Sequence, residues 1–335
     1  MKIDRILRKI FLAILFLVLI FWVYFFVGNP PQPEKYIFGV DFHQEHSQLL
    51  GLDWKENYLA LLDDLKVRNF KIAGQWDLIE KEKDKYDFSD LDWQIEEVEK
   101  RGGSIILIIG MKTGRWPECH IPNWAKGLPK EDLEKEILEI LKEIVLRYQN
   151  SKTVLMWQVE NEPLFPFGEC PFADKKFLAK EIKLVKELDS LKRPIIISDS
   201  GEGSFWLNAG YLGDIVGTTM YKKVWVSQLK FYLNYPFPPI FYWRKARIID
   251  LLFKKKVMVI ELQAEPWGPK LLYDIPLAEQ EKTMNLERFK SNIEFAKKTG
   301  FDTIYLWGGE WWFWLKEKQE RPEIWEEARK LFVNQ

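Results

Sequence analysis

One stretch near the middle of the chain decides how the rest is interpreted: Val154-Leu155-Met156-Trp157-Gln158-Val159-Glu160-Asn161-Glu162-Pro163. It begins as a mostly apolar run, which is typical of a buried strand. Proline cannot donate to a strand ladder, so the strand should end before Pro163 and leave Asn161 and Glu162 at its exit. Desolvation at such an edge raises the pKa of a carboxyl group, which suits a general acid. A strand that merely runs out into a polar loop is the plain alternative.

Short apolar runs of this kind alternate along the chain with longer amphipathic ones, such as residues 133–148. Strands separated by helices favour parallel pairing, and eight of them close most simply into a (β/α)8 TIM barrel, an α/β fold. A doubly wound open sheet is the alternative, but no glycine-rich fingerprint follows the first strand. The eight predicted strands are residues 36–41, 70–74, 104–110, 153–159, 194–198, 214–218, 257–261 and 303–307.

The N-terminus has basic residues, among them Lys2 and Lys9, followed by an uncharged apolar run over residues 10–27. That run is just long enough to cross a bilayer as a helix, and its basic flank should stay in the cytoplasm. We therefore expect residues 1–27 to form a cytoplasmic stub and a transmembrane signal anchor that contacts the lipid bilayer through residues 10–27. A cleaved signal peptide is the alternative, but no small-x-small cleavage site lies near the end of the run.

The remainder of the chain is then expected outside the cytoplasm, at the cell surface or in the periplasm. Residues 28–35 contain three prolines and should form a short, stiff linker, and residues 36–335 should form one catalytic domain. The two cysteines, Cys119 and Cys170, follow the third and fourth predicted strands, on neighbouring loops of one barrel face. Because disulfides are permitted outside the cytoplasm, we predict that these two cysteines are paired.

The composition of the 335 residues narrows the choice of partner. The formal net charge of -1 offers no electrostatic case for nucleic acid. The chain is rich in aromatic residues, with 16 Trp, 12 Tyr and 23 Phe. Such rings fill cores, but they also suit a site that stacks on the flat apolar faces of sugars. Many of the tryptophans stand at or just beyond predicted strand ends, which favours a binding cleft.

Glu261 ends the seventh predicted strand as Glu162 ends the fourth. In a barrel of eight strands, both carboxylates would then face the same central mouth. Hydrolysis of a glycosidic bond needs such a pair, because one group protonates the leaving oxygen while the other attacks or stabilises the anomeric carbon. Glu265, four residues further on, is the alternative partner if the seventh strand ends later.

The segment Trp157-Gln158-Val159-Glu160-Asn161-Glu162-Pro163 resembles the Asn-Glu-Pro motif of clan A retaining glycoside hydrolases, which have a (β/α)8 barrel. Residues 86–92 are similar to a segment found in cellulase-type family 5 and β-galactosidase-type family 42 members. The resemblance implies that Glu162 is the acid/base and Glu261 the nucleophile. One departure concerns the second strand, where the clan usually has an arginine that contacts the nucleophile and this sequence has Lys71.

The same resemblance implies roles for three further residues. Asn161 would bind the sugar 2-hydroxyl, Tyr221 would support the nucleophile, and Trp307 would form the floor of the reacting subsite. Other side chains predicted to bind substrate are chosen because they follow strand ends, and they are His43, Trp76, Trp116, Glu310 and Trp311.

His43 and His46 are candidate metal ligands, because histidine after a first strand can hold zinc. The chain has only three histidines, and none follows the fifth or sixth strand. We therefore expect no metal and no cofactor. The sequence predicts a membrane-anchored retaining glycosidase acting on a carbohydrate, with a transglycosylase and a catalytically silent glycan-binding barrel as the alternatives.

Overall fold

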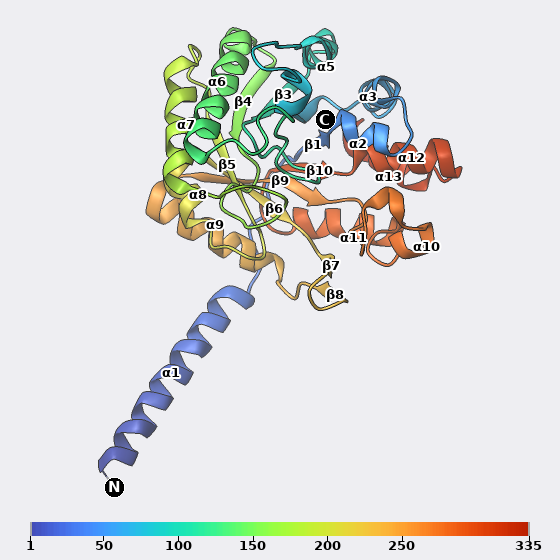
Figure 1. Ribbon diagram of the computed structural model, residues 1–335. Coiled ribbons are helices and arrows are strands. Elements are labelled where there is room, and N and C mark those ends of the chain that lie inside the picture. Colours follow the sequence, from blue (N-terminus) through green and yellow to red (C-terminus); the bar gives the residue numbers. More distant parts are fainter. Residues whose placement is uncertain (1, 334–335) are drawn as a thin grey trace.

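The computed structural model describes residues 2–333, with side chains described from residue 6 onward. Eight parallel strands close into a barrel in the order β1-β10-β9-β6-β5-β4-β3-β2 (Figure 1). The predicted (β/α)8 barrel is therefore confirmed, and an open doubly wound sheet is excluded because β1 pairs with both β10 and β2. The barrel strands are β1 (Ile37–Phe42), β2 (Asn69–Ala73), β3 (Ser104–Ile109), β4 (Val154–Val159), β5 (Ile195–Asp199), β6 (Ile215–Met220), β9 (Lys256–Gln263) and β10 (Thr303–Trp307).

Helices surround the barrel and cover its outer face (Figure 1). Several begin at side-chain caps, since Asp53, Asp174 and Asn285 each accept hydrogen bonds from backbone N–H groups of the first turn. The helices after the first strand are α2 (Gln44–Leu49), α3 (Trp54–Asp63), α4 (Trp76–Ile79), α5 (Ser89–Lys100), α6 (Lys130–Tyr148), α7 (Lys175–Leu188), α8 (Leu207–Leu212), α9 (Pro239–Phe253), α10 (Leu277–Gln280), α11 (Leu286–Lys297), α12 (Gly309–Gln319) and α13 (Glu323–Phe332).

The core has two layers, because successive side chains of a strand point to opposite faces of the sheet. The outer layer joins the strands to the helices through a large cluster of buried apolar side chains. The interior holds a small cluster that includes Ile106, Ile260 and Tyr305. The Tyr305 ring lies so close to Gly39 that a Cβ there would sit 2.3 Å from it, which explains the glycine in β1. The polar side chains lie beyond this interior cluster, at the carboxyl ends of the strands.

Residues 222–253, which have little clear pattern in the sequence, form an antiparallel hairpin followed by α9. The hairpin consists of β7 (Lys223–Val226) and β8 (Phe231–Asn234) and lies outside the barrel sheet. Pro236 and Pro238 separate it from the helix, which begins at Pro239. A 3-10 turn, η1 (Leu272–Asp274), forms part of the loop that follows β9.

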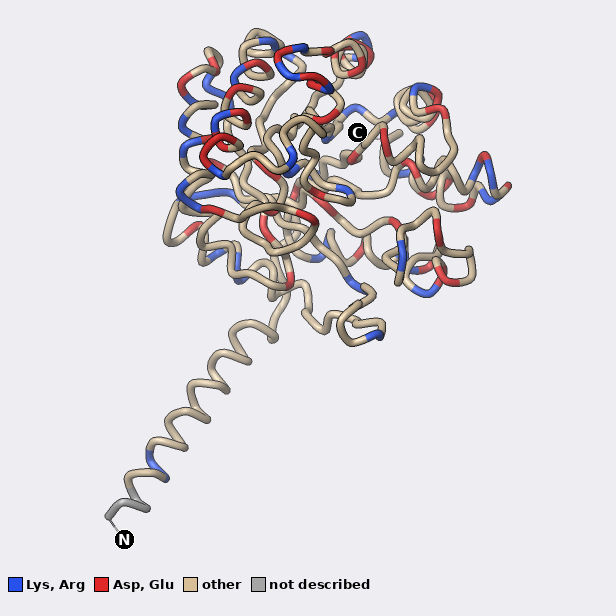
Figure 2. The backbone as a smooth tube through the Cα atoms, in the orientation of Figure 1, with Lys and Arg blue, Asp and Glu red and all other residues tan. Residues whose placement is uncertain are grey.

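The N-terminal helix α1 (Lys2–Phe26) leaves the barrel beside α9 and extends away from it (Figure 1). Its segment Ile6–Phe26 is long and apolar enough to cross a membrane. Figure 2 shows no charged residue along this helix between its basic start and the barrel. The helix includes most of the residues predicted to span a bilayer.

Candidate active site

The exit of β4 has an unusual backbone. Glu160 and Glu162 both have positive φ angles, 60° and 42°, a conformation that costs energy for residues other than glycine and persists only where neighbours enforce it. Here the Glu162 N–H donates to Ser198 Oγ at 2.7 Å, and the Asn161 N–H donates to the Lys112 carbonyl at 2.6 Å. These bonds fix the direction in which the Glu162 side chain leaves the strand.

Glu160 faces a different way from Glu162. Its carboxylate accepts hydrogen bonds from the backbone N–H groups of Met111 and Lys112, just beyond β3, and it shares a hydrogen bond with Glu181 of α7. Burial raises the pKa of both Glu160 and Glu181. Glu160 therefore holds the β3 and β4 exits together from the helix side.

Glu162 and Glu261 flank one residue, Thr219 of β6. The Thr219 hydroxyl donates to Glu162 Oε1 at 3.0 Å, and Thr219 is the neighbour of Glu261 in the β6–β9 register. Burial raises the pKa of Glu162 well above its usual value, and the charge of Glu261 raises it further. The two carboxyl groups therefore act on each other electrostatically, as groups at one mouth should.

A bulge in β9 explains the direction of Glu261. Met258 and Ile260 belong to the interior cluster, so strict alternation would turn Glu261 outward to the helices. Between the pairs Thr218↔Val259 and Thr219↔Glu261, however, β9 contains one residue more than β6. The pairing of β9 with β10 shifts in the same region. Bulges re-aim side chains in this way, and this one lets Glu261 point into the mouth.

Lys71 supplies the positive charge next to Glu261. Its side chain is fully buried, with Nζ 3.1 Å from Asp41 Oδ2 and 3.9 Å from Glu261 Oε1. Burial raises the pKa of Glu261, whereas Lys71 and then Arg115 oppose that rise. The pKa of Asp41 is raised well above its usual value, mainly by burial. The lysine on strand two thus takes the place beside Glu261 that the sequence resemblance would give to arginine.

A second group of carboxylates is built around Arg115. The guanidinium forms ion pairs with Glu265 and, at 3.0 Å, with Glu310, and it stacks 4.1 Å from the centroid of the Trp307 ring. Trp307 Nε1 donates to Glu265 Oε1 at 2.8 Å, and the His43 N–H donates to Glu310 Oε1 at 2.5 Å. Burial raises the pKa of Glu310 to about 7, although Arg115 opposes this. These bonds hold both carboxylates in place.

Glu118 is a further buried carboxyl group at the mouth, which sequence reasoning missed. Burial raises its pKa to about 7; Lys112 opposes the rise, the charge of Glu261 adds to it, and a hydrogen bond with Asn161 lowers the pKa. Its neighbour Cys119 forms a disulfide with Cys170, as predicted, with Cα atoms 5.3 Å apart. The disulfide ties the Glu118 loop to the loop that follows Glu162, and this proximity is the signal that would have drawn attention to Glu118.

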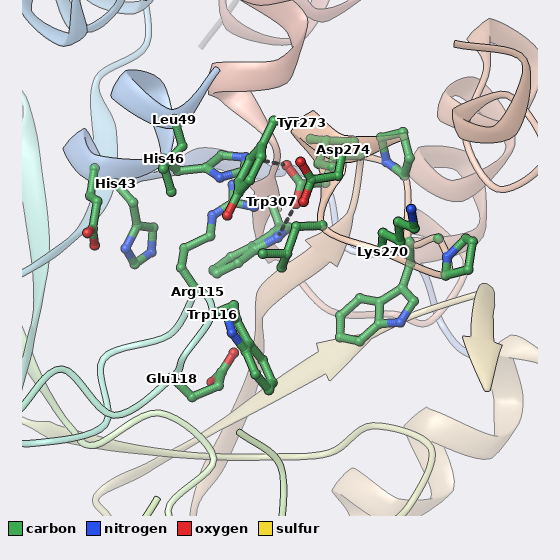
Figure 3. Close-up of a pocket in the computed structure, with 18 of the residues that line it drawn as sticks. His43, His46, Leu49, Arg115, Trp116, Glu118, Lys270, Tyr273, Asp274 and Trp307 are labelled. Carbon is green, nitrogen blue, oxygen red and sulfur yellow. Dashed lines mark hydrogen bonds and ion pairs between the residues drawn. The ribbon is translucent and has the colours of Figure 1, made fainter. Parts of the chain in front are cut away.

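A cavity of about 500 Å³ opens beside these groups (Figure 3). Its wall includes Glu118 and Glu265, but neither Glu162 nor Glu261. Glu118, which interacts electrostatically with both members of the pair, connects the cavity to them. Several aromatic rings line the cavity, and they are those of Trp116, Phe167, Trp267, Tyr273 and Trp307.

Some of the predicted substrate-binding residues lie at this cavity. Trp116 is 44% exposed in its wall, and Trp307 is also part of the wall, with one ring face covered by Arg115. His43 is buried there, and neither of its ring nitrogens has a hydrogen-bond partner among the described residues. Burial lowers the pKa of His43 well below its usual value, so the ring is neutral. Burial raises the pKa of Tyr221 well above its usual value, and the charges of Glu261 and then Glu162 raise it further.

Trp76 and Trp311 are placed differently from our prediction. Trp76 is fully buried at the start of α4, where it packs on Trp124 and its Nε1 donates to Glu80. Trp311 is buried in α12 and donates to Gln280 at 2.7 Å, away from the cavity just described. A position after a strand end does not fix whether a ring turns to the mouth or to the core. Here the helices α4 and α12 turn both rings inward.

No group of three or more His, Cys, Asp or Glu side chains within residues 2–333 is arranged to hold a metal ion. His46 lies 3.7 Å from Glu265 Oε2, and His120 Nδ1 bonds to Gln75 at 2.9 Å. The pKa of His120 is raised by Asp77, against the effect of burial. His46 and His120 therefore contact residues around the cavity.

No family model and no curated protein matches the sequence, but solved structures resemble the fold. Xylanase 10B from Thermotoga petrophila RKU-1, in complex with xylobiose, has a TM-score of 0.53 at 15% identity, over 82% of both chains. GH5_18 from Streptomyces cattleya, in complex with GlcNAc, has a TM-score of 0.56 at 11% identity, over 84% of this chain and 71% of that one. A β-galactosidase from Halorubrum lacusprofundi has a TM-score of 0.54 at 15% identity.

The match to the β-galactosidase covers 81% of this chain and 52% of the enzyme, so the chain spans about half of its length. At such identities a likeness shows the fold alone. These neighbours are glycoside hydrolases, as the resemblance in the sequence led us to expect. The chain therefore shares the (β/α)8 barrel fold of these enzymes.

Proposed function

We propose that the chain is a membrane-anchored retaining glycoside hydrolase that cleaves a β-linked glycan or glycoside outside the cytoplasm. The observation that carries this proposal is the position of Glu162 and Glu261 on either side of Thr219, one bonded to its hydroxyl and the other adjacent in register. Two buried carboxyl groups at one barrel mouth, with different local partners, suit the separate roles of acid and nucleophile.

Glu162 and Glu261 have different roles in the first step. Glu162 is protonated, because burial and the nearby charge of Glu261 raise its pKa well above the usual value. Glu261 is ionised with help from Lys71 and Arg115. A Glu261 oxygen attacks the anomeric carbon while the glycosidic bond breaks, and the proton of Glu162 passes to the leaving oxygen.

The second step returns the enzyme to its starting state. Glu162, now ionised, takes a proton from water, and the resulting oxygen attacks the anomeric carbon of the glycosyl-enzyme. The bond to Glu261 breaks, and the sugar leaves with its original anomeric configuration. We propose that Asn161 and Tyr221 position the sugar and the nucleophile, and that the aromatic wall of the cavity stacks on neighbouring sugar rings.

Two features support the location. The α1 helix is apolar along a length that suits a bilayer, and its basic start favours the cytoplasmic side. The Cys119–Cys170 disulfide is typical of an oxidising compartment. Both are accounted for by an uncleaved anchor with the barrel outside the cytoplasm. The neighbours with bound xylobiose and GlcNAc support a carbohydrate as the substrate class.

The proposal is tested with a panel of aryl β-glycosides, using NMR to follow the anomer that forms first. We expect hydrolysis of at least one member with retention of configuration. Glu162→Gln should lower the rate by about 10² to 10⁴-fold on substrates with poor leaving groups. Glu96→Gln, at an exposed position on α5, is the control and should leave the rate unchanged. A first product of inverted configuration, or full activity of Glu162→Gln, would contradict the proposal.

A further inference from the structure

The outer face of α8 and α9 exposes apolar side chains next to the site where α1 joins the barrel. On α8 these are Leu207 and Tyr211, and on α9 they are Leu251 and Leu252, which are 71% and 58% exposed. The two helices pack closely, since a Cβ at Gly210 would lie 2.7 Å from the Phe253 ring. These exposed residues therefore belong to one continuous surface, which we call the α8–α9 face.

The last turn of α1 docks at one end of this face. Phe25 packs its ring 5.7 Å from Phe205 and 5.6 Å from Phe241, and the Arg244 guanidinium lies 4.7 Å from the Tyr24 ring. Figure 1 shows α8 and α9 on the side of the barrel from which α1 departs. Whatever surrounds α1 is therefore close to the α8–α9 face.

Helical spacing extends the docking site along α9. Phe241 contacts α1. Residues seven, ten and eleven positions further along a helix lie on the same side of it, and in α9 these are Ile248, Leu251 and Leu252. Ten residues of helix span about 15 Å, so the exposed leucines are about that far from the exit of α1. The apolar surface of α9 thus continues beyond the part of the helix that α1 covers.

Lysine and arginine side chains flank the α8–α9 face. Lys175 lies 5.1 Å from the Tyr211 ring, and Lys254 is exposed at the end of α9. Arg247, next to Trp243, forms an ion pair with Asp250 at 3.0 Å. Apolar and aromatic side chains flanked by lysine and arginine match the interface of a membrane, where the chains enter the headgroup region and the cations meet acidic lipids.

We propose that the α8–α9 face lies against the lipid bilayer that holds α1, so that the barrel rests on the membrane by its side. This inference rests on the proposed anchoring by α1. The bilayer is favoured over a second protein as the occupant because the face is continuous with the docking site of the spanning helix. The mouth of the barrel would then be held at a fixed height above the headgroups, which favours glycans presented at the membrane surface.

The test uses the full chain, with its disulfide intact, in vesicles of phosphatidylcholine and phosphatidylglycerol. Leu252→Cys is labelled with a small fluorophore, and some of the lipids carry a nitroxide quencher near the headgroup. Leu146→Cys on α6 is the matched control, because Leu146 is also an exposed leucine on a helix. Figure 1 shows α6 on a part of the barrel away from α1. We expect a several-fold larger loss of fluorescence at position 252 than at position 146.

Tyr211→Cys provides a second probe and should be quenched like Leu252→Cys. Quenching at positions 211 and 252 no greater than at 146 would overturn the proposal, as would shielding of these positions that depends on protein concentration, since that indicates a second copy. Alkaline extraction distinguishes the anchoring by α1 from the membrane contact of the α8–α9 face. A chain that is extracted from the vesicles refutes the anchor, whereas a chain that stays but shows no quenching refutes only the membrane contact.

Discussion

Two groups of buried carboxylates lie at the same barrel mouth, and they differ in their partners. Glu265 and Glu310 are each bonded to Arg115 and to a further N–H donor. Glu162 receives one hydrogen bond from a threonine hydroxyl, and the nearest cation to Glu261 is 3.9 Å away. A carboxylate held by a guanidinium keeps its position, whereas one with weak partners is free to move toward a substrate and form a bond. The comparison supports the proposal that Glu265 and Glu310 are structural and that Glu162 and Glu261 carry out the chemistry.

The most direct test of this comparison determines which carboxylate forms the covalent bond with the sugar. Glu261→Ala should lose at least about 10³-fold in rate, because both steps depend on the nucleophile. Azide fits the space left by the side chain and should restore turnover, with a glycosyl azide of inverted configuration as the product. Rates and product configuration are measured by NMR on an activated aryl glycoside.

Glu265→Ala is the matched control, since it removes the carboxylate that the sequence left as the alternative nucleophile. It should give no inverted azide product. In Glu162→Ala, azide should instead attack the glycosyl-enzyme and yield a product of retained configuration. An inverted azide product from Glu265→Ala, together with none from Glu261→Ala, would exchange the roles of the two groups.

The second test concerns stability. Arg115→Met leaves Glu265 and Glu310 buried without their shared cation, which should cost about 3 to 5 kcal/mol in the free energy of unfolding. Arg101→Met is the control. It also removes an arginine that bridges two carboxylates, but at the surface, so it should cost about 1 kcal/mol or less. Chemical denaturation measures both values, and equal losses would show that the Arg115 cluster is not a scaffold.

The two groups also differ in how far sequence could identify them. Glu162 was found because an apolar strand ends in charge, and the barrel placed Glu261 at the same mouth. The bulge that turns Glu261 inward has no signature that we recognised. Glu118 lies in a loop without periodicity, so only three-dimensional proximity reveals it. Position alone failed for Trp76 and Trp311, because a residue after a strand can turn to the core as easily as to the mouth.

Lys71 offers a test through the acidic limb of the pH profile. Attack requires ionised Glu261, so kcat/KM falls as the pH drops through the pKa of Glu261. Lys71 lowers that pKa. Lys71→Met should therefore raise it and move the acidic limb to higher pH, whereas Lys71→Arg, which keeps the charge, should move the limb much less. An acidic limb that stays in place in Lys71→Met would show that the lysine acts only on Asp41.

Glu118 gives the smallest expected effect, on the opposite limb. Glu162 must be protonated at the first step, so kcat/KM falls as the pH rises through the pKa of Glu162. The charge of Glu118 raises that pKa, and Glu118 itself becomes ionised only above a pH of about 7. Glu118→Gln should therefore lower the pKa of Glu162 and move the basic limb down by up to about one pH unit.

Glu118→Asp keeps a carboxylate at this position and should leave the basic limb nearer to its original place. Both variants retain a polar group on the side chain, so a change in folding alone does not predict that the basic limb moves in Glu118→Gln and stays in Glu118→Asp. Glu118 touches the cavity on one side and Asn161 on the other. If the basic limb does not move in Glu118→Gln, the pKa of Glu162 is set by burial and Glu261 alone. Glu118 then does not belong with Glu162 and Glu261.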